Sequence, residues 1–345
     1  MQVGVIGAGA IARRGHLPAL NSLEGIELIG LADVDNQALR SVSKRFGVEK
    51  TYNDYKEMLR TEIDAVIVCV PTQLHSVVVV DAANAGKHVL VEKPLSSTTA
   101  EAQEIVAAAK RNAVIITTVQ NYRYFPAIQE MYRRLADGRI GRLLSIDGAC
   151  HTRPPMSWTR GTWLYQFGGV LDDFAPHIFD MACWFANSDI ADVHAYGDDY
   201  VGNMQCINHA LVSVRFENNT LATTSASWLM GTSKVTLGLY GTGGTMMTDI
   251  QTNNFVEAHG FSTPLDDLRY VSRKMLNIAR LGLSGRLFQG AMQFYPKLLS
   301  DFFRSIERKS PPIVSLEESA RVVAILDTAR AQLRSGRSEV SRPAP

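Results

Sequence analysis

Short apolar runs alternate with amphipathic segments through the first 120 residues of the chain. The apolar runs are rich in Val, Ile and Leu and predict buried strands at 2–6, 27–33, 65–70, 88–91 and 113–120. The segments between them carry apolar residues at helical spacing, which predicts helices up to about residue 23 and over 37–46, 77–85 and 98–112. This alternation predicts right-handed βαβ crossovers and a doubly wound parallel sheet, so the fold class is α/β.

Beyond Asn121 the pattern changes to runs that alternate with period two. Residues 210–216 and 220–228 flank a polar Asn218-Asn219 turn, and the alternation returns at 235–239. Adjacent alternating runs joined by short polar links predict an open, largely antiparallel sheet. Helices predicted at 174–185 and about 315–334 are candidates to cover one of its faces, and Ser315-Leu316-Glu317-Glu318 fits a capping box.

The length of 345 residues fits two domains. We expect a first domain over 1–120, built on the parallel sheet, and a second domain over 121–345, with a final helix at about 315–334 that can pack back on the first domain. The sheet of the second domain would leave one face available for self-association, so we expect a homodimer or homotetramer.

The composition excludes several classes of partner and site. The 35 Lys and Arg residues balance 34 Asp and Glu residues, so no basic field would attract nucleic acid. The four cysteines show no Cys/His ligand spacing, so we expect no metal site and a reducing compartment. No basic segment precedes the first apolar run, and Gly and Pro interrupt that run, so we expect a cytoplasmic protein without a membrane span.

The sequence Gly7-x-Gly9-x-x-Ala12 follows a predicted strand and opens a predicted helix. In that position Gly7 allows the tight turn, Gly9 lets the backbone approach a pyrophosphate, and Ala12 permits close contact between helix and strand. The N–H groups of the first helical turn, at Ala10 and Ile11, would face the phosphates. The alternative is a glycine-rich turn with only a structural role.

Asp33 ends the second predicted strand, 21 residues after Ala12. A carboxylate there can accept hydrogen bonds from the adenosine ribose and would repel a 2′-phosphate. NAD is therefore favoured as cofactor and NADP stays possible. Asp35 could take this role if the strand runs longer, and either acid could instead cap the next helix.

Glu92-Lys93-Pro94 follows a buried strand at the carboxyl edge of the predicted sheet, where open α/β folds bind ligands. Lys93 would face the cleft there, although an isolated lysine more often only extends its head group into solvent. Asp173-x-x-x-His177, preceded by Gly168-Gly169, adds a histidine, the side chain whose ordinary pKa suits a general base near neutral pH.

Together these motifs resemble those of the glucose–fructose oxidoreductase, inositol dehydrogenase and rhizopine catabolism (GFO/IDH/MocA) family. The resemblance covers almost the whole chain and includes further matches at Pro71-x-x-x-His75, Asn121-Tyr122-Arg123-Tyr124, Trp163 and Gly241-Thr242-x-Gly244. It implies a Rossmann domain, a C-terminal α/β domain, and NAD- or NADP-dependent oxidation or reduction of a carbohydrate-like alcohol. Lys93 and His177 would be the acid/base residues, with Asp173 orienting them.

The resemblance also implies binding roles for other positions. Pro71, His75, Glu92, Lys93 and Asn121 join the glycine motif and Asp33 as candidate cofactor contacts. Arg123, Trp163 and Tyr165 are candidate substrate contacts, although aromatic residues more often fill cores. His16 and His75 could line the cofactor site or simply pack at helix ends. The family commonly has a small flexible residue, and no proline, shortly before the histidine. This chain has Ala175-Pro176 there, which alters the start of the helix.

One stretch, residues 269–309, is strongly basic and matches no family pattern. It holds nine Lys or Arg residues against two acids. Because arginine forks suit phosphate groups, we expect Arg269, Arg273 or Arg280 to border the substrate site. An alternative is that this segment binds an anionic membrane, although Gly282, Gly285, Gly290 and Pro296 weaken any long helix.

The sequence therefore predicts an NAD(P)-dependent oxidoreductase that transfers a hydride between nicotinamide and a secondary alcohol or ketone. The expected substrate is a sugar, cyclitol or nucleotide-linked sugar. The alternative is a non-catalytic NAD-binding sensor or scaffold, against which the presence of Lys93, Asp173 and His177 argues.

Overall fold

The computed structural model describes residues 1–153, 169–201, 206–231, 233–259, 264–283 and 290–336. The chain forms two compact units. Unit 1 comprises Met1–Asn121 and Ala291–Val323, and unit 2 comprises Tyr122–Gly290 and Ala324–Pro345. The predicted second domain, 121–345, differs from this division at residues 291–314, which belong to unit 1.

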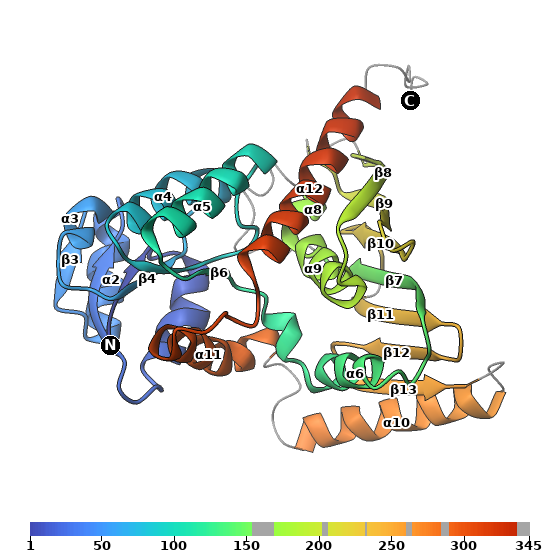
Figure 1. Ribbon diagram of the computed structural model, residues 1–345. Coiled ribbons are helices and arrows are strands. Elements are labelled where there is room, and N and C mark those ends of the chain that lie inside the picture. The colour runs from blue at the N-terminus through green and yellow to red at the C-terminus, as the bar shows by residue number, and fades with distance from the viewer. Residues whose placement is uncertain (154–168, 202–205, 232, 260–263, 284–289, 337–345) are drawn as a thin grey trace. The chain divides into compact units, whose positions relative to one another are not determined.

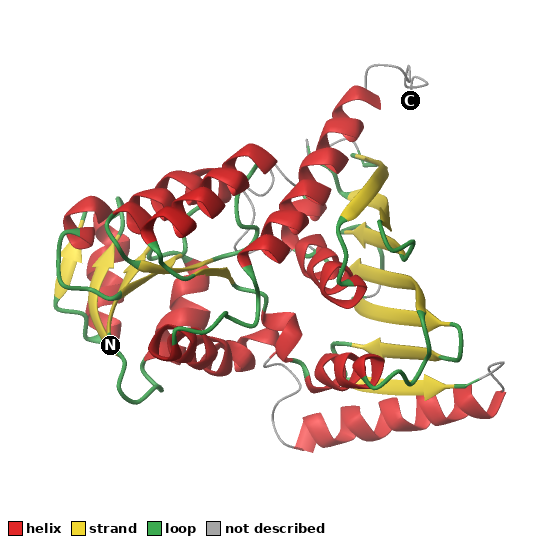
Figure 2. Cartoon of the chain, viewed as in Figure 1, coloured by secondary structure: helices red, strands yellow, loops and turns green. Residues whose placement is uncertain are grey.

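Unit 1 is built on a six-stranded parallel sheet with the order β3-β2-β1-β4-β5-β6, which confirms the doubly wound fold. Its strands are β1 (Gln2–Ile6), β2 (Glu27–Ala32), β3 (Lys50–Tyr52), β4 (Ala65–Val68), β5 (His88–Val91) and β6 (Ile116–Thr118). Strands β1, β4 and β5 are buried almost throughout because helices cover both faces of the sheet (Figure 2).

Two groups of helices cover the faces of this sheet. On one face lie α4 (His75–Asn84) and α5 (Thr99–Asn112), and α11 (Tyr295–Arg308) lies on the other (Figure 1). The remaining helical segments of unit 1 are η1 (Ala12–His16), α1 (Leu17–Leu20), α2 (Asn36–Phe46), α3 (Tyr55–Leu59), η2 (Thr72–Leu74) and η5 (Gly290–Phe294). The segment η1 is a π-helical turn, and α11 packs against it and against α1.

Unit 2 is built on a seven-stranded sheet with the order β13-β12-β11-β7-β10-β9-β8. All neighbours pair antiparallel except β7 with β10, so the sheet is largely antiparallel, as predicted. The strands are β7 (Leu143–His151), β8 (Ile190–Asp198), β9 (His209–Phe216), β10 (Leu221–Ser227), β11 (Lys234–Gly241), β12 (Thr245–Asp249) and β13 (Asn254–Ala258).

Helices cover one face of the second sheet (Figure 1). As a consequence, every second residue of strand β9 is buried, and the residues between them face the other side of the sheet. These helices are α6 (Pro126–Ala136), α8 (Val170–Asp173), α9 (Ala175–Ala186) and the second half of α12 (Leu316–Gly336). A single turn, η3 (Asn121–Tyr124), precedes α6, and a long helix, α10 (Pro264–Leu283), packs on β13 at the sheet edge.

The predicted capping box at the start of α12 is confirmed. The Glu318 N–H donates to Ser315 Oγ at 3.1 Å, and Glu318 Oε2 accepts from the Ser315 N–H at 2.9 Å. The first turns of α12 attach to unit 1, where Thr118 Oγ1 lies 2.7 Å from Ser319 Oγ. Farther along, the Gln332 side chain donates to the Val193 carbonyl and accepts the Ala195 N–H, both on β8. The rest of the helix therefore covers unit 2.

Candidate active site

The turn after β1 has the geometry that its glycines predict. Gly7 has φ +101°, and a Cβ there would lie 2.6 Å from the Cys69 carbonyl oxygen, so only glycine fits. Gly9 is exposed, and no atom lies within 4 Å of the position that its Cβ would take. A helix begins at Ala10, so its free N–H groups face the same open space. The turn has the room and the donors that a pyrophosphate needs.

Asp33 and Asp35 have different partners. Asp33 Oδ2 accepts the Ala8 N–H at 2.6 Å, and its Oδ1 accepts the Asp35 N–H at 2.9 Å, so this carboxylate lies against the glycine turn. Asp35 is the N-cap of α2 and accepts the N–H groups of Gln37 and Ala38. Asp35 is thus occupied by capping, and Asp33 is the acid beside the glycine turn.

The ends of the neighbouring strands carry the other predicted cofactor contacts. Pro71 is exposed at the start of η2, and Asn121 is 5% exposed with no hydrogen-bond partner for its Oδ1 among the described residues. A buried amide oxygen without a partner fits a residue that awaits a ligand. His75 differs from the expectation. It is 1% exposed, and its ring nitrogens lie 2.8 Å from the Pro94 carbonyl and 3.0 Å from the Val70 carbonyl.

His75 therefore ties together the two loops that follow β4 and β5, and burial lowers its pKa. Glu92 likewise turns inward. It is 8% exposed and accepts hydrogen bonds from His16 and Tyr295, whereas Lys93 beside it is only half-buried. Direct contacts of His75 and Glu92 with a dinucleotide stay predictions, and in this geometry both side chains hold the loop of Lys93.

In unit 2, His177 lies in the first turn of α9 and is 6% exposed. Its ring stacks on Tyr122, with 4.3 Å between ring centroids and 9° between ring planes, which fixes the orientation of the imidazole. Burial raises the pKa of Tyr122, and the charges of Cys150 and Asp173 raise it further. Tyr122 thus acts as a neutral platform.

Asp173 is the last residue of α8, and its Oδ2 accepts the Trp228 Nε1–H at 3.1 Å. It does not cap α9, because the N-cap of that helix is Phe174, without a side-chain hydrogen bond. Pro176 occupies the first turn of α9, where its missing N–H has no consequence, so the departure from the family pattern is accommodated.

Arg123 is fully buried and bonds Asp180 in a bidentate pair. Arg123 Nε lies 2.8 Å from Asp180 Oδ2, and Nη2 lies 2.7 Å from Oδ1. The guanidinium also lies 4.7 Å from the Trp184 ring centroid. Its predicted contact with substrate stays a prediction, and in this structure the guanidinium is committed to Asp180.

Two family models match the chain. One, an oxidoreductase family with an NAD-binding Rossmann fold, matches residues 1–120, and the other, a GFO/IDH/MocA C-terminal domain, matches residues 128–247. The chain belongs to the GFO/IDH/MocA family. This confirms the resemblance inferred from its motifs.

Relatives of known activity extend the comparison. The myo-inositol 2-dehydrogenase of Thermotoga maritima is 32% identical over 228 residues, which is 64% of this chain and 66% of that protein. The match thus spans slightly less than two thirds of that relative. Levoglucosan dehydrogenase in complex with NADH and levoglucosan has a TM-score of 0.81 at 20% identity, over 97% of both chains.

The WlbA dehydrogenase from Bordetella pertussis, in complex with NADH and UDP-GlcNAcA, also has a TM-score of 0.81. Its identity is 18%, over 97% of this chain and 96% of that one. These structural likenesses show that the fold of the family extends over nearly the whole chain.

The roles of several other predicted residues stay predictions. Trp163, Tyr165 and Gly168 lie outside the described residues. Arg273 and Arg280 are exposed on α10, where Arg273 Nη1 lies 3.5 Å from the Phe255 carbonyl oxygen, and their predicted contact with substrate stays a prediction. None of the described helices combines the length and apolar character needed to cross a membrane.

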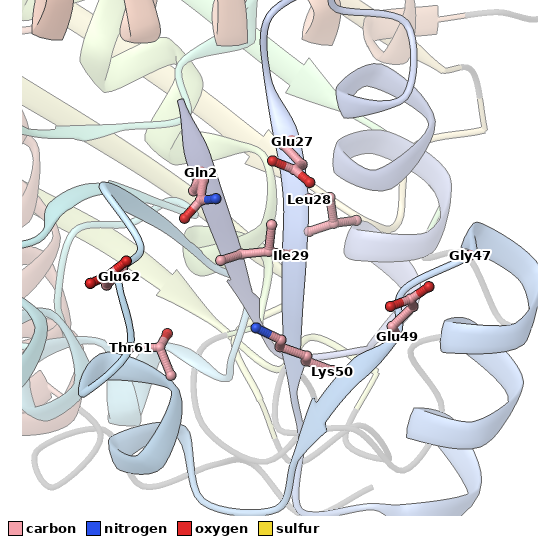
Figure 3. Close-up of a pocket in the computed structure, with 9 residues that line it drawn as sticks. All are labelled: Gln2, Glu27, Leu28, Ile29, Gly47, Glu49, Lys50, Thr61 and Glu62. Atoms are coloured by element: carbon pink, nitrogen blue, oxygen red, sulfur yellow. The ribbon is translucent and has the colours of Figure 1, made fainter.

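A cavity of about 780 Å³ opens at the other end of the Rossmann sheet (Figure 3). Its lining includes Gln2, Glu27 and Lys50, which lie at the amino ends of β1, β2 and β3. Ligands of this fold bind at the carboxyl ends, where the glycine turn and Asp33 lie. The cavity is therefore separate from the family's cofactor site.

Four residues hold the site in ways that the sequence does not show. His16 and Tyr295 bond Glu92, Tyr122 supports His177, and Trp228 bonds Asp173. Tyr122 belongs to a motif of the family resemblance, and His16 was expected to line the cofactor site or to pack at a helix end. Tyr295 and Trp228 are far away in sequence, and no local pattern distinguishes them from core aromatic residues.

Proposed function

We propose that the protein is an NAD-dependent oxidoreductase that interconverts a secondary alcohol and a ketone on a sugar, cyclitol or nucleotide-linked sugar. The observation that carries this proposal is the glycine turn with Asp33 bonded to its Ala8 N–H at 2.6 Å. It sits in a chain of a family whose relatives include a myo-inositol dehydrogenase and a levoglucosan dehydrogenase.

The chain's own residues divide the work. The N–H groups at Ala10 and Ile11 hold the pyrophosphate, Asp33 accepts the ribose hydroxyls, and Asn121 contributes its buried amide oxygen. When bound, NAD accepts or donates the hydride. Asp33 disfavours NADP because a 2′-phosphate would lie against a carboxylate. Titration with both dinucleotides checks this preference, and tighter binding of NADP would contradict it.

His177 takes the proton of the reacting hydroxyl, and the Lys93 ammonium stabilises the negative charge that develops on that oxygen. Asp173, whose carboxylate is held by Trp228, orients the imidazole of His177 and balances the charge of Lys93. The stack on Tyr122 keeps the imidazole in one orientation.

The test is turnover with a panel of myo-inositol, levoglucosan, glucose 6-phosphate and a UDP-linked sugar acid. We expect Lys93→Ala and His177→Ala each to lower kcat by about 100-fold or more, with little change in NAD affinity. Lys110→Ala, at an exposed position, is the control. Normal turnover in His177→Ala would move the base to Asp173 or Tyr165. NAD binding without turnover of any panel member would favour a sensor.

We also propose that the protein is cytoplasmic and forms a homodimer or homotetramer. The face of the seven-stranded sheet opposite α9 exposes Leu211 and Leu221, each at 50%. Light scattering of the purified protein measures the assembly, and a monomer at all concentrations would contradict this proposal.

A further inference from the structure

Glu92 is a buried carboxylate with three donors. Its Oε1 lies 2.8 Å from His16 Nε2 and 3.1 Å from the Tyr295 hydroxyl, and its Oε2 accepts the Lys93 N–H at 3.3 Å. His16 is 0% exposed and Tyr295 is 2% exposed. The carboxylate thus connects two buried residues to the backbone of the proposed catalytic lysine.

Local features of three elements build this cluster. His16 ends the π-helical turn η1, and such turns are rare and frequently occur at functional sites. Tyr295 begins α11, and its ring fits against Gly15, where a Cβ would lie only 2.8 Å from the ring. The rings of His16 and Tyr295 meet edge to face, with 4.8 Å between centroids. The chain therefore reserves space for this tyrosine beside Glu92.

Glu92 is charged in this environment. Burial acts to raise its pKa, but the hydrogen bond from His16, the charge of Lys93 and the Tyr295 hydroxyl together hold the pKa below its ordinary value. Two other titratable groups face it. Burial, and then the charge of Glu92, raise the pKa of Cys69, and the same charge opposes the burial that lowers the pKa of His75.

We propose that His16 and Tyr295 are positioning residues for Lys93 and that they act through Glu92. This proposal rests on the proposed function, in which Lys93 touches the reacting oxygen. Glu92 fixes the Lys93 backbone through its Oε2 and so holds the start of the lysine side chain in one place. His16 and Tyr295 keep that carboxylate buried, oriented and ionised.

The test measures the reactivity of the Lys93 amine in the protein without substrate. Acylation of Lys93 is followed by mass spectrometry, with exposed Lys110 as the internal reference. Tyr295→Phe keeps the ring and removes only the hydroxyl. Tyr55→Phe is the matched control, because its hydroxyl bonds Asp81 at 2.7 Å elsewhere in unit 1.

Loss of these hydrogen bonds loosens the loop and makes the half-buried amine more accessible, so Lys93 should be acylated about tenfold faster in Glu92→Gln and about threefold faster in Tyr295→Phe. Tyr55→Phe should leave the rate unchanged. Equal rates in wild type and Tyr295→Phe would overturn the proposal. If Glu92→Gln does not fold, the comparison of the two tyrosine variants still decides.

Turnover separates this proposal from the proposed function. Tyr295→Phe should lower kcat more than it changes KM or NAD affinity. If Lys93→Ala kept normal turnover while acylation still responded to Tyr295→Phe, the proposed function would fail and the link through Glu92 would stand. If the acylation rate of Lys93 did not respond to Tyr295→Phe, only the positioning role of His16 and Tyr295 would be contradicted.

An independent observation concerns α10, which lies along β13 at the edge of the second sheet (Figure 1). Large apolar side chains are exposed along this helix by 40–91%. They are Leu265, Leu268, Val271, Met275, Leu276, Ile278 and Leu283. Of the residues expected to weaken a long helix here, Gly282 lies within α10, one position before the helix ends at Leu283.

The polar side of α10 fixes its orientation on the sheet. Lys274 Nζ lies 2.6 Å from Asp249 Oδ2, and Asn277 Nδ2 donates to the Asn253 carbonyl at 3.1 Å. The Tyr270 carbonyl accepts from Asn254 Nδ2 at 3.2 Å. The helix is therefore attached by its polar side and presents its apolar side outward.

The shape and charge of this surface indicate its partner. Leu268, Val271, Met275 and Ile278 form one stripe, and Leu265, Leu276 and Leu283 make it broader than a narrow helix-pairing seam. Arg269, Arg273 and Arg280 follow one border of the stripe. We propose that α10 binds an anionic membrane surface, with its apolar side at the lipid and its arginines at the head groups.

Co-sedimentation with vesicles tests this second proposal. We expect binding to equimolar phosphatidylcholine and phosphatidylglycerol, weaker binding to phosphatidylcholine alone, and about a tenfold loss of binding in Met275→Asp. Leu221→Asp, at another exposed apolar position, on β10, should leave binding unchanged. Absence of vesicle binding would overturn the proposal. A self-association that Met275→Asp abolishes would assign the stripe to a second copy of the chain.

Discussion

Glu92 in unit 1 and Asp180 in unit 2 are both buried carboxylates, and each lies near a proposed catalytic residue. Glu92 precedes Lys93, and Asp180 follows His177 by three residues on α9. Their partners differ. Asp180 binds a guanidinium through two hydrogen bonds at 1% exposure or less, whereas Glu92 binds an imidazole, a phenol and a backbone N–H.

The ion pair of Asp180 holds the fold, whereas the hydrogen bonds of Glu92 adjust how easily that carboxylate ionises. Removing one member of the Arg123–Asp180 pair leaves an unpaired charge in the core. Removing one donor from Glu92 leaves two others and shifts only the ease of its ionisation. The same kind of residue therefore supports stability in unit 2 and the conformation of the lysine loop in unit 1.

The largest expected effect comes from breaking the ion pair. Arg123→Met should lower the free energy of unfolding by about 3–5 kcal/mol, because it leaves Asp180 buried without its partner. Urea unfolding followed by circular dichroism at neutral pH measures the loss. Arg123→Met combined with Asp180→Leu should recover most of it, because apolar side chains of similar volume replace the whole pair. A loss below about 1 kcal/mol in the single variant would mean that the pair is not the main support of this region.

The second expected effect concerns the pH dependence of Glu92. Its pKa is lowered in the folded state, so its contribution to stability is present above the ordinary value of 4.5 and is lost as the pH falls through the folded pKa. Glu92→Gln should therefore be less stable than wild type by about 2 kcal/mol near neutral pH, with a gap that narrows below pH 4.5. Urea unfolding at a series of pH values measures the gap. A gap that widens in acid would contradict the assignment of Glu92 as a stabilised anion.

Local pattern was enough to predict the parallel sheet, the glycine turn and the capping box at Ser315. The glycine turn and the capping box depend on residues within a few positions of one another, and each strand and helix of the sheet has its own local pattern, whose alternation implies the parallel order. The same holds for β9 and β10, whose alternation and Asn218-Asn219 turn predict their pairing. Strand β8 was missed because Ala191, Ala195 and Gly197 weaken its alternation, and β13 was missed because it has only five residues.

The supports of the site could not be predicted, because they depend on long-range contacts. Tyr295 is 203 residues from Glu92, and Trp228 is 55 residues from Asp173. Neither pairing leaves a local pattern. Arg123 and His75 are predicted to contact ligands because they belong to motifs, and these contacts stay predictions. A motif shows which residues matter but not whether their side chains face a ligand or the core. Burial decides that, and it is a property of the packed chain.

The smallest expected effect concerns how the two helices near these residues begin. Helix α5, which follows Lys93, has a complete capping box between Thr98 and Glu101, whereas α9 begins at Phe174 without a side-chain cap. Thr98→Ala should lower the free energy of unfolding by about 1 kcal/mol, because the Glu101 N–H loses its acceptor. Thr98→Ser keeps the hydroxyl and should restore stability. Because Glu92 and not the cap holds the Lys93 backbone, acylation of Lys93 should be the same in Thr98→Ala and wild type. A faster rate in Thr98→Ala would show that the start of α5 also positions the lysine, and that the loop is held from both ends.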